Sequence, residues 1–235
     1  MIKEAIQYVV GLGKSEIHER NGQDFSDKQL HLLKEPTAGS LDVNTLSGLV
    51  DYLKSEFDGN DQVIVHVEGP TSVVAHSQLN SDENRSCWIQ AKAMTPSFHF
   101  GRFNDTEEFN IGLQSCFVRS EDRDIMLKVV GNIKEEMVSN YGDDGVAQSV
   151  VAKAGVASVA KVEVPNPVLL APYRTFIEVV QPESDFVFRM QSGPRCAIFE
   201  ADGGAWKNDA IERIKDYLAA SLKDQVESGR ITIIA

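Results

Sequence analysis

The segment from Glu200 to Lys207 (EADGGAWK) holds the residue types and spacing that could do chemistry. Glu200 and Asp202 are two positions apart at the end of a predicted strand, so their carboxylates point to the same face. Two glycines then lead into a predicted helix, whose first N–H groups have no partner within the helix. Free N–H groups of this kind can bind an anion, and paired carboxylates can act as acid and base. The segment therefore predicts a small polar site.

A structural role explains the same residues. Aspartate is a common helix cap, and Gly203 and Gly204 let the chain turn sharply before the helix. Acidic residues at helix starts are also favoured by the helix dipole alone, so we favour the cap over an anion site. The segment is not a P-loop, because the pattern G-x-x-x-x-G-K-[ST] does not occur.

A second set of residues could line a groove for a small ligand. Arg174 and Arg189 lie on predicted strands, where a guanidinium could recognise a phosphate or a carboxylate. Aromatic side chains could stack on a base. The alternatives are ion-paired surface arginines and aromatic residues of a core or a subunit contact. The candidate ligand-binding residues are Trp88, Phe98, Arg174, Arg189, Asp202, Gly203, Gly204 and Trp206.

Metal and nucleophile chemistry lack a signature in this sequence. The histidines form neither HxH nor HExxH, so their spacing predicts no metal site. His66 and His76 fall on the two arms of one predicted hairpin, but we do not expect them to face each other directly. No G-x-S-x-G occurs, and no CxxC pair is present, so we expect buried or half-buried, reduced thiols. The three cysteines are Cys87, Cys116 and Cys196. We expect no catalytic residue, no metal and no cofactor.

Composition narrows the classes of partner. The chain has 235 residues, with 23 Lys and Arg against 35 Asp and Glu, a net charge of −12. This balance argues against direct binding of nucleic acid, which needs clustered basic residues. No stretch approaches the roughly 20 apolar residues of a membrane span, and the N-terminus is not a signal peptide. We therefore expect a cytoplasmic protein.

The elements that would position these residues form an α+β fold with antiparallel β meanders, because strands cluster with strands rather than alternating with helices. We expect a central helical hairpin, and a C-terminal helix followed by a last strand. Either the chain forms an N-terminal region at 1–142 and a C-terminal region at 143–235, or it is one continuous domain. Helices are expected at 2–11, from a cap at Asn44 or Thr45 to Gly59, and at 105–117, 125–141 and 205–226. Strands are expected around Asn21-Gly22 and at 30–33, 62–68, 71–79, 86–94, 146–153, 156–164, 168–170, 173–180, 185–191, 196–201 and 231–234.

Several patterns are similar to those of a known family. Residues 162–170 read V-x-V-P-x-x-V-x-L, residues 176–179 read F-x-E-V, and residues 186–190 read F-x-F-R-M. With the HLLKEPTAGSLDVNTLSGLVDYL segment, the chain resembles, over about residues 29–218, an uncharacterised family of phage and prophage early-region proteins. It departs from that pattern at 105–141 and at the EADGGAWK turn. The resemblance implies an accessory or counter-defence role in the cytoplasm of an infected bacterium, and it supplies no catalytic residues.

We therefore expect a non-enzymatic protein that acts by binding, in one version by sequestering a nucleotide-derived host-defence signal. A homo-oligomer is expected because the edges of the meanders need to be covered. One alternative is an acidic inhibitor, or DNA mimic, of a host protein. Another is a hydrolase that uses Glu200 and Asp202 as an acid/base pair.

Overall fold

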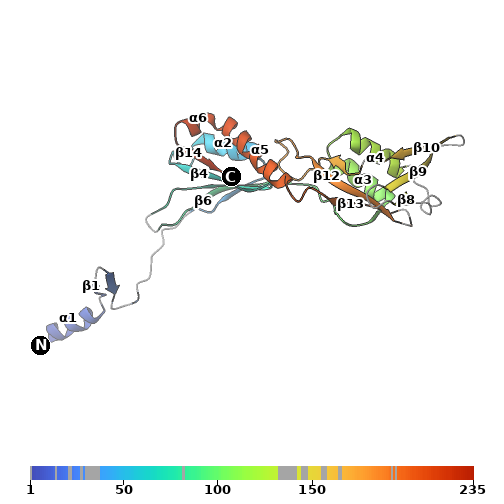
Figure 1. Cartoon of the computed structure of the whole chain (residues 1–235). Coiled ribbons are helices and arrows are strands. Elements are labelled where there is room, and N and C mark those ends of the chain that lie inside the picture. The colour runs from blue at the N-terminus through green and yellow to red at the C-terminus, as the bar shows by residue number, and fades with distance from the viewer. Residues whose placement is uncertain are drawn as a thin grey trace. The chain divides into compact units, whose positions relative to one another are not determined.

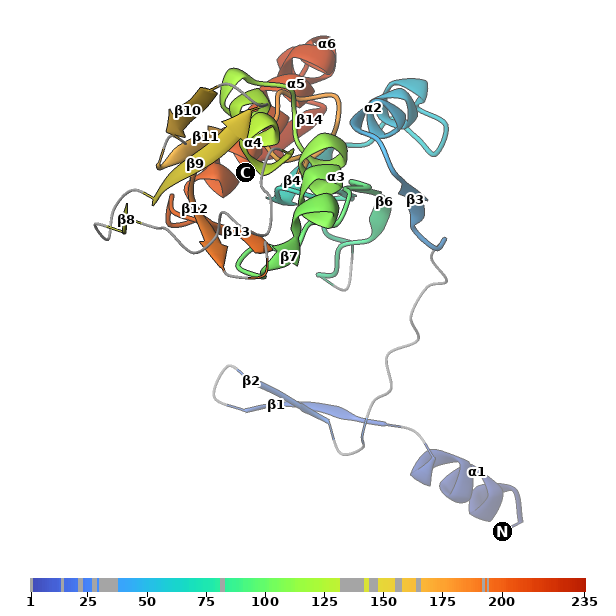
Figure 2. The same cartoon turned by 90° about the vertical axis from the view of Figure 1, so that its right-hand side faces the viewer.

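Contacts between residues divide the chain into two units, Met1–Ala38 and Gly39–Ala235. The computed structural model describes residues 2–13, 15–20, 23–26, 29, 38–80, 83–131, 142–143, 148–154, 158–163, 166–191, 193 and 195–235. The first unit has helix α1 (Ile2–Leu12), labelled in Figure 1, and a hairpin of β1 (Ile17–Arg20) and β2 (Gln23–Ser26), whose two strands are labelled in Figure 2. Both were predicted. The strand predicted at 30–33 lies outside the described residues.

One part of the second unit is built around a five-stranded sheet. The sheet contains β3 (Leu41–Val43), β4 (Val63–Gly69), β5 (Ser72–His76), β6 (Cys87–Lys92) and β14 (Ile231–Ile234), in the order β14-β4-β5-β6-β3. The antiparallel meander β4-β5-β6 and the last strand were predicted. Both edge strands pair in parallel, β14 with β4 and β3 with β6, which the strand pattern did not reveal.

Helices α2 (Leu46–Ser55) and α5 (Trp206–Ser221) cover one face of this sheet (Figure 1), and the short α6 (Lys223–Glu227) follows α5. The buried alternate residues of β4 (Val63, Val65 and Val67) pack in one cluster with buried leucines and isoleucine of the two helices. Of the two caps predicted for α2, Asn44 and Thr45, the structure has Thr45, whose Oγ1 accepts a hydrogen bond from the N–H of Gly48 at 3.0 Å. The helix ends at Glu56, before the predicted Gly59.

A four-stranded sheet and a helical hairpin form the other part of the second unit. The order of the sheet is β11 (Val168–Leu170), β12 (Ser184–Gln191), β13 (Arg195–Glu200) and β7 (Asn104–Asp105). Helices α3 (Thr106–Cys116) and α4 (Glu121–Gly131) lie side by side, as Figure 1 and Figure 2 show. The central helical hairpin was predicted, and the part of the second helix beyond 131 lies outside the described residues. Buried phenylalanines from the four-stranded sheet and from the helical hairpin form the core between them, among them Phe109, Phe117, Phe186 and Phe188.

The strand-rich region after residue 142 contains β8 (Gly142–Asp143), β9 (Gln148–Ala154) and β10 (Ser158–Glu163), paired in the order β10-β9-β8. The hairpin predicted at 146–164 corresponds to β9 and β10. The fold is thus α+β with mostly antiparallel sheets, as predicted. Among the residues that the structure describes, no helix has the length and apolar character needed to cross a membrane.

The strand predicted at 173–180 was wrong. These residues form turns and irregular backbone between β11 and β12. The buried amide of Gln181 supplies the hydrogen bonds that a neighbouring strand would have given. Its Oε1 accepts from the N–H groups of Arg174 and Thr175, and its Nε2 donates to the carbonyls of Phe176 and Val179.

Candidate functional site

The irregular segment between β11 and β12 carries Arg174, a cation that is only 8% exposed. Its Nη1 donates to Glu200 Oε1 at 2.9 Å, and its Nη2 donates to Ser184 Oγ. The guanidinium lies 4.0 Å from the ring centroid of Trp206, in the geometry of a cation–π contact. Burial lowers the pKa of Arg174 to about 10, although the nearby carboxylates of Glu200 and Asp202 oppose this effect. The group stays positively charged at neutral pH.

Asp202 joins this cluster through Ser184, whose hydroxyl donates to Asp202 Oδ2 at 2.8 Å. The same carboxylate accepts from the N–H of Gly204 at 3.0 Å and from that of Trp206 at 3.3 Å. Burial raises the pKa of Asp202, but the hydrogen bonds from Ser184, Gly204 and Trp206 and the charge of Arg174 outweigh it, so the pKa lies below its ordinary value. Asp202 therefore stays ionised at neutral pH.

These bonds favour the structural interpretation of the turn before α5. The N-cap residue of α5 is Ala205, which has no side-chain capping bond, and Asp202 reaches the N–H of the first helical residue instead. Gly203 and Gly204 have φ angles of 63° and 83°, a region that glycine adopts without strain. Because the Asp202 carboxylate already occupies N–H groups at this helix start, they are not free for an external anion.

The structure brings part of the predicted ligand-binding set together. Arg174, Asp202, Gly204 and Trp206 are linked by the contacts above. Trp88 lies half-buried in β6 against the core of the five-stranded sheet, and no described contact joins it to this cluster. Arg189 lies half-buried in β12, where its Nη1 donates to the carbonyl of Phe188 at 3.0 Å.

Phe98 and Arg174 do line one pocket, of about 290 Å³. Phe98 packs against the phenylalanine core, with its ring centroid 5.0 Å from that of Phe100. The lining combines aromatic rings, small polar residues and one charged group: Thr95, Pro96, Ser97, Phe98, Phe100, Cys116, Pro172, Tyr173 and Arg174. We call this space the Phe98–Arg174 pocket.

Two buried donors of this region have no hydrogen-bond partner among the described residues, Arg174 Nε and Trp206 Nε1. A buried polar group without a partner costs about 1–3 kcal/mol. Arg174 is among the residues that line the Phe98–Arg174 pocket, whereas Trp206 is not. The positive charge of Arg174 faces two carboxylates, Glu200 and Asp202, so this cluster carries a net charge of −1 when all three are ionised.

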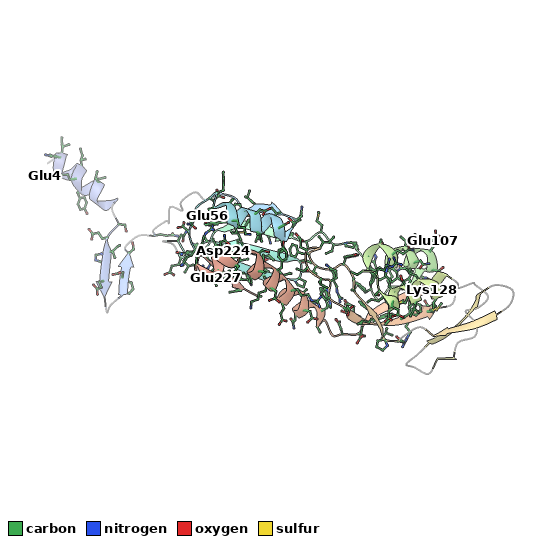
Figure 3. The ribbon with its side chains drawn as sticks, turned by 90° about the horizontal axis from the view of Figure 1, so that it is seen from above. Glu4, Glu56, Glu107, Lys128, Asp224 and Glu227 are labelled. Carbon is green, nitrogen blue, oxygen red and sulfur yellow. The ribbon has the colours of Figure 1, made fainter. Side chains whose placement is uncertain are left out.

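A larger pocket of about 420 Å³ lies between the end of α2 and α6. The buried Arg230 donates from Nη1 to Glu56 Oε1 at 3.0 Å within it. Figure 3 labels Glu56 and Asp224, which both line it, and Glu227, which follows on α6. Arg230 Nε, like Arg174 Nε, is a buried donor without a partner among the described residues, but the described lining of this pocket holds no aromatic ring on which a ligand could stack.

Sequence reasoning missed one cluster. One ligand atom each of His66, Glu68 and His76 lie within 4.8 Å of one another on the β4–β5 hairpin. Alternation could have found it, because residues 66 and 68 share a face of one strand, and a hairpin can place residue 76 on the same face. Motifs such as HxH and HExxH do not detect this cluster, because its ligands come from two strands on either side of a turn.

The thiols are free and sit as expected, with Cys116 and Cys196 buried and Cys87 half-buried. Burial raises the pKa of Cys196 to about 12, which keeps that thiol protonated and unreactive.

Comparison with protein-family models gives no match to the chain, and neither the curated proteins nor the solved structures give one. The resemblance to phage early-region proteins therefore stays a prediction.

Proposed function

We propose that the protein acts by binding a small ligand that carries a planar aromatic group, such as a nucleobase, in the Phe98–Arg174 pocket. The observation that carries this proposal is the lining itself. Phe98, Phe100 and Tyr173 offer ring surface beside a buried arginine whose Nε has no partner among the described residues. Aromatic side chains stack on bases of any sequence, and a guanidinium donor can bind a base acceptor.

The size of the pocket limits the ligand. At about 290 Å³ it lies at the lower end of small-molecule sites, which span about 300–1,000 Å³. A base or a nucleoside fits this space, whereas a dinucleotide would extend beyond it. The net charge of −1 around Arg174, and the lack of a second basic residue in the described lining, favour contacts to the base rather than to a phosphate.

The biological setting is proposed from the sequence resemblance. An origin among phage early-region proteins would make the ligand a nucleotide-derived host-defence signal, which the protein sequesters without turnover. The hydrolase alternative has less support, because Asp202 is ionised and hydrogen-bonded to the start of α5, so it is unsuited to donate a proton.

The test is a binding screen on the full chain. Purified protein is titrated with bases, nucleosides and cyclic and linear nucleotides by isothermal calorimetry, and native mass spectrometry searches for ligand that copurifies. We expect at least one base-containing compound to bind with one site per chain. The variant Thr95→Trp, at an exposed position of the pocket wall, should weaken this binding at least tenfold by filling the space.

The matched control is Thr71→Trp, an equally exposed threonine that does not line the pocket. It should bind like the parent protein. If no base-containing compound binds, or if Thr95→Trp and Thr71→Trp bind equally well, the proposal is wrong.

A further inference from the structure

One face of the five-stranded sheet is covered by helices, and the opposite face carries both polar and apolar side chains, among them Val74, which is 3% exposed. In β4 the buried valines at 63, 65 and 67 alternate with Ile64, His66 and Glu68. In β5 the register places Val74 opposite His66, and His76 opposite Ile64. His66 and His76 are therefore diagonal neighbours on this second face, as the strand pairing requires.

The cluster His66–Glu68–His76 has the composition of a transition-metal site. Two imidazole nitrogens and one carboxylate oxygen are ligands of Zn²⁺, which binds them at about 2.0–2.2 Å. Hard cations such as Mg²⁺ and Ca²⁺ prefer sites made of oxygen alone. Atoms in a tetrahedral zinc shell are about 3.3 Å apart, so the present separations of up to 4.8 Å can close by rotation of the side chains.

The strands hold the three side chains in a fixed relation. β4 and β5 both lie inside the sheet, and His66 is paired on both sides, opposite Val74 of β5 and Ile234 of β14. The β4–β5 register shifts at Glu68, between Val67 and Gly69, and the β5–β6 register shifts between Ala75 and His76. The two histidines are half-buried, whereas Glu68 is exposed. Among the described residues, no hydrogen bond or ion pair holds either imidazole, so both rings can turn toward an ion.

Hydrogen bonds from residues outside the cluster orient the carboxylate of Glu68. Ser72 Oγ donates to Glu68 Oε2 at 2.7 Å, and Gln90 Nε2 donates to Ser72 Oγ at 3.2 Å. This chain orients one oxygen of Glu68 and leaves the other without a described partner. Partners of this kind orient metal ligands, and their loss commonly lowers metal affinity 10- to 100-fold.

We propose that His66, Glu68 and His76 bind one divalent transition-metal ion of the Zn²⁺ type. Three protein ligands leave at least one coordination position for water or a bound molecule, as in zinc sites that are not purely structural. The ion would also link β4 to β5 on the face that the helices leave open. This inference is independent of the Phe98–Arg174 pocket, which shares no residue with the cluster.

The experiment uses the full chain, freed of metal by a chelator and titrated with Zn²⁺ against a chromophoric competitor, and in parallel with Co²⁺. We expect one ion per chain and a visible Co²⁺ absorption band typical of a site with fewer than six ligands. Each of His66→Asn, His76→Asn and Glu68→Gln should lower Zn²⁺ affinity at least tenfold. Ser72→Ala should lower it about 10- to 100-fold while leaving all three ligands in place.

Two controls match these changes. His99→Asn and Glu83→Gln replace exposed residues outside the cluster and should leave the affinity unchanged. Circular dichroism of each variant verifies that it is folded, and Glu68→Gln keeps the shape of the side chain if a histidine variant does not fold. The proposal is overturned by a stoichiometry other than one, by no binding at about 0.1 mM free Zn²⁺, or by cluster variants that bind like the controls.

Discussion

At the scale of single residues, Arg174 organises its surroundings because a buried charge must be paired. Its guanidinium is satisfied on one side by Glu200 and Ser184 and packs on the ring of Trp206. Removing one partner of such a pair leaves an uncompensated buried charge, which is strongly destabilising. The same arginine contributes to the wall of the Phe98–Arg174 pocket, so its scaffold role and its proposed ligand contact cannot be separated by deleting it.

Asp202 gives a prediction at this scale. Its pKa is lower in the folded protein than in the unfolded chain, so the unfolded chain binds the proton more readily. The stability that this residue contributes is therefore complete above the ordinary aspartate pKa of about 3.9, and it is lost as the pH falls through the folded value. In Asp202→Asn the free energy of unfolding should fall less steeply with decreasing pH below about 4, as measured by urea denaturation.

The exposed Asp216 on α5 provides the matched change, Asp216→Asn, whose curve should run parallel to that of the parent protein. Parallel curves for Asp202→Asn and the parent would contradict the bonds described for Asp202.

Residue types alone placed Arg174, Asp202 and Trp206 in one predicted set. They did not reveal why these residues come into contact. Arg174 and Glu200 are 26 positions apart, and their pairing depends on a loop that was predicted as a strand. His66, Glu68 and His76 were not grouped because their proximity depends on the β4–β5 register and on side-chain reach. Spacing rules find ligands on one element, and they miss those that two strands supply.

At the scale of elements, segment 173–180 shows where alternation misleads. Its residues TFIEVV have high strand propensity, which reflects a fit to a half-buried pleated surface rather than an intrinsic backbone preference. Here Phe176 and Val179 are buried in the core of the five-stranded sheet, while Ile177 and Val180 are exposed. The buried amide of Gln181 then replaces the missing ladder, because buried backbone groups need a partner.

The variant Gln181→Ala tests this explanation. It removes the side-chain partners of the N–H groups of Arg174 and Thr175 and of the Val179 carbonyl, whereas the Phe176 carbonyl still accepts from the N–H of Val179. We expect the free energy of unfolding to fall by about 2 kcal/mol or more, since each unsatisfied buried group costs about 1–3 kcal/mol. Gln78→Ala, which removes an exposed bond to Gln62, should cost less than about 0.5 kcal/mol. Equal losses in the two variants, measured by urea denaturation, would show that Gln181 does not hold the loop.

Local signals predicted most of the other elements. Turn residues between short apolar runs indicated the hairpins, apolar spacing indicated α2 and α5, and acidic residues at a helix start indicated α3. The pairing of β14 with β4 joins residues about 170 positions apart, and no local pattern encodes it. Periodicity shows that a strand exists and which face is buried, whereas its partner is decided by the packing of the whole sheet.

At the scale of the whole molecule, two hydrophobic clusters each combine residues from both sides of residue 142. The cluster of the five-stranded sheet includes Leu46 and Ile231, and the phenylalanine cluster includes Phe109 and Phe188. The described cores are thus completed by the C-terminal half of the chain. The core of the five-stranded sheet cannot form fully until the last strand, β14, has paired with β4.

The last strand therefore gives a prediction about the stability of the whole unit. Ile231 is 2% exposed and packs in the cluster of the five-stranded sheet, whereas Ile234 in the same strand is 45% exposed. Ile231→Ala should lower the free energy of unfolding by about 2–5 kcal/mol, because it removes buried methyl groups and leaves a cavity. Ile234→Ala keeps the same backbone and should cost less than about 1 kcal/mol. The measurement is urea denaturation followed by tryptophan fluorescence, since Trp88 packs against this cluster. Similar losses for the two variants would show that β14 is a peripheral addition to the sheet, whereas the predicted difference makes the chain end part of its core.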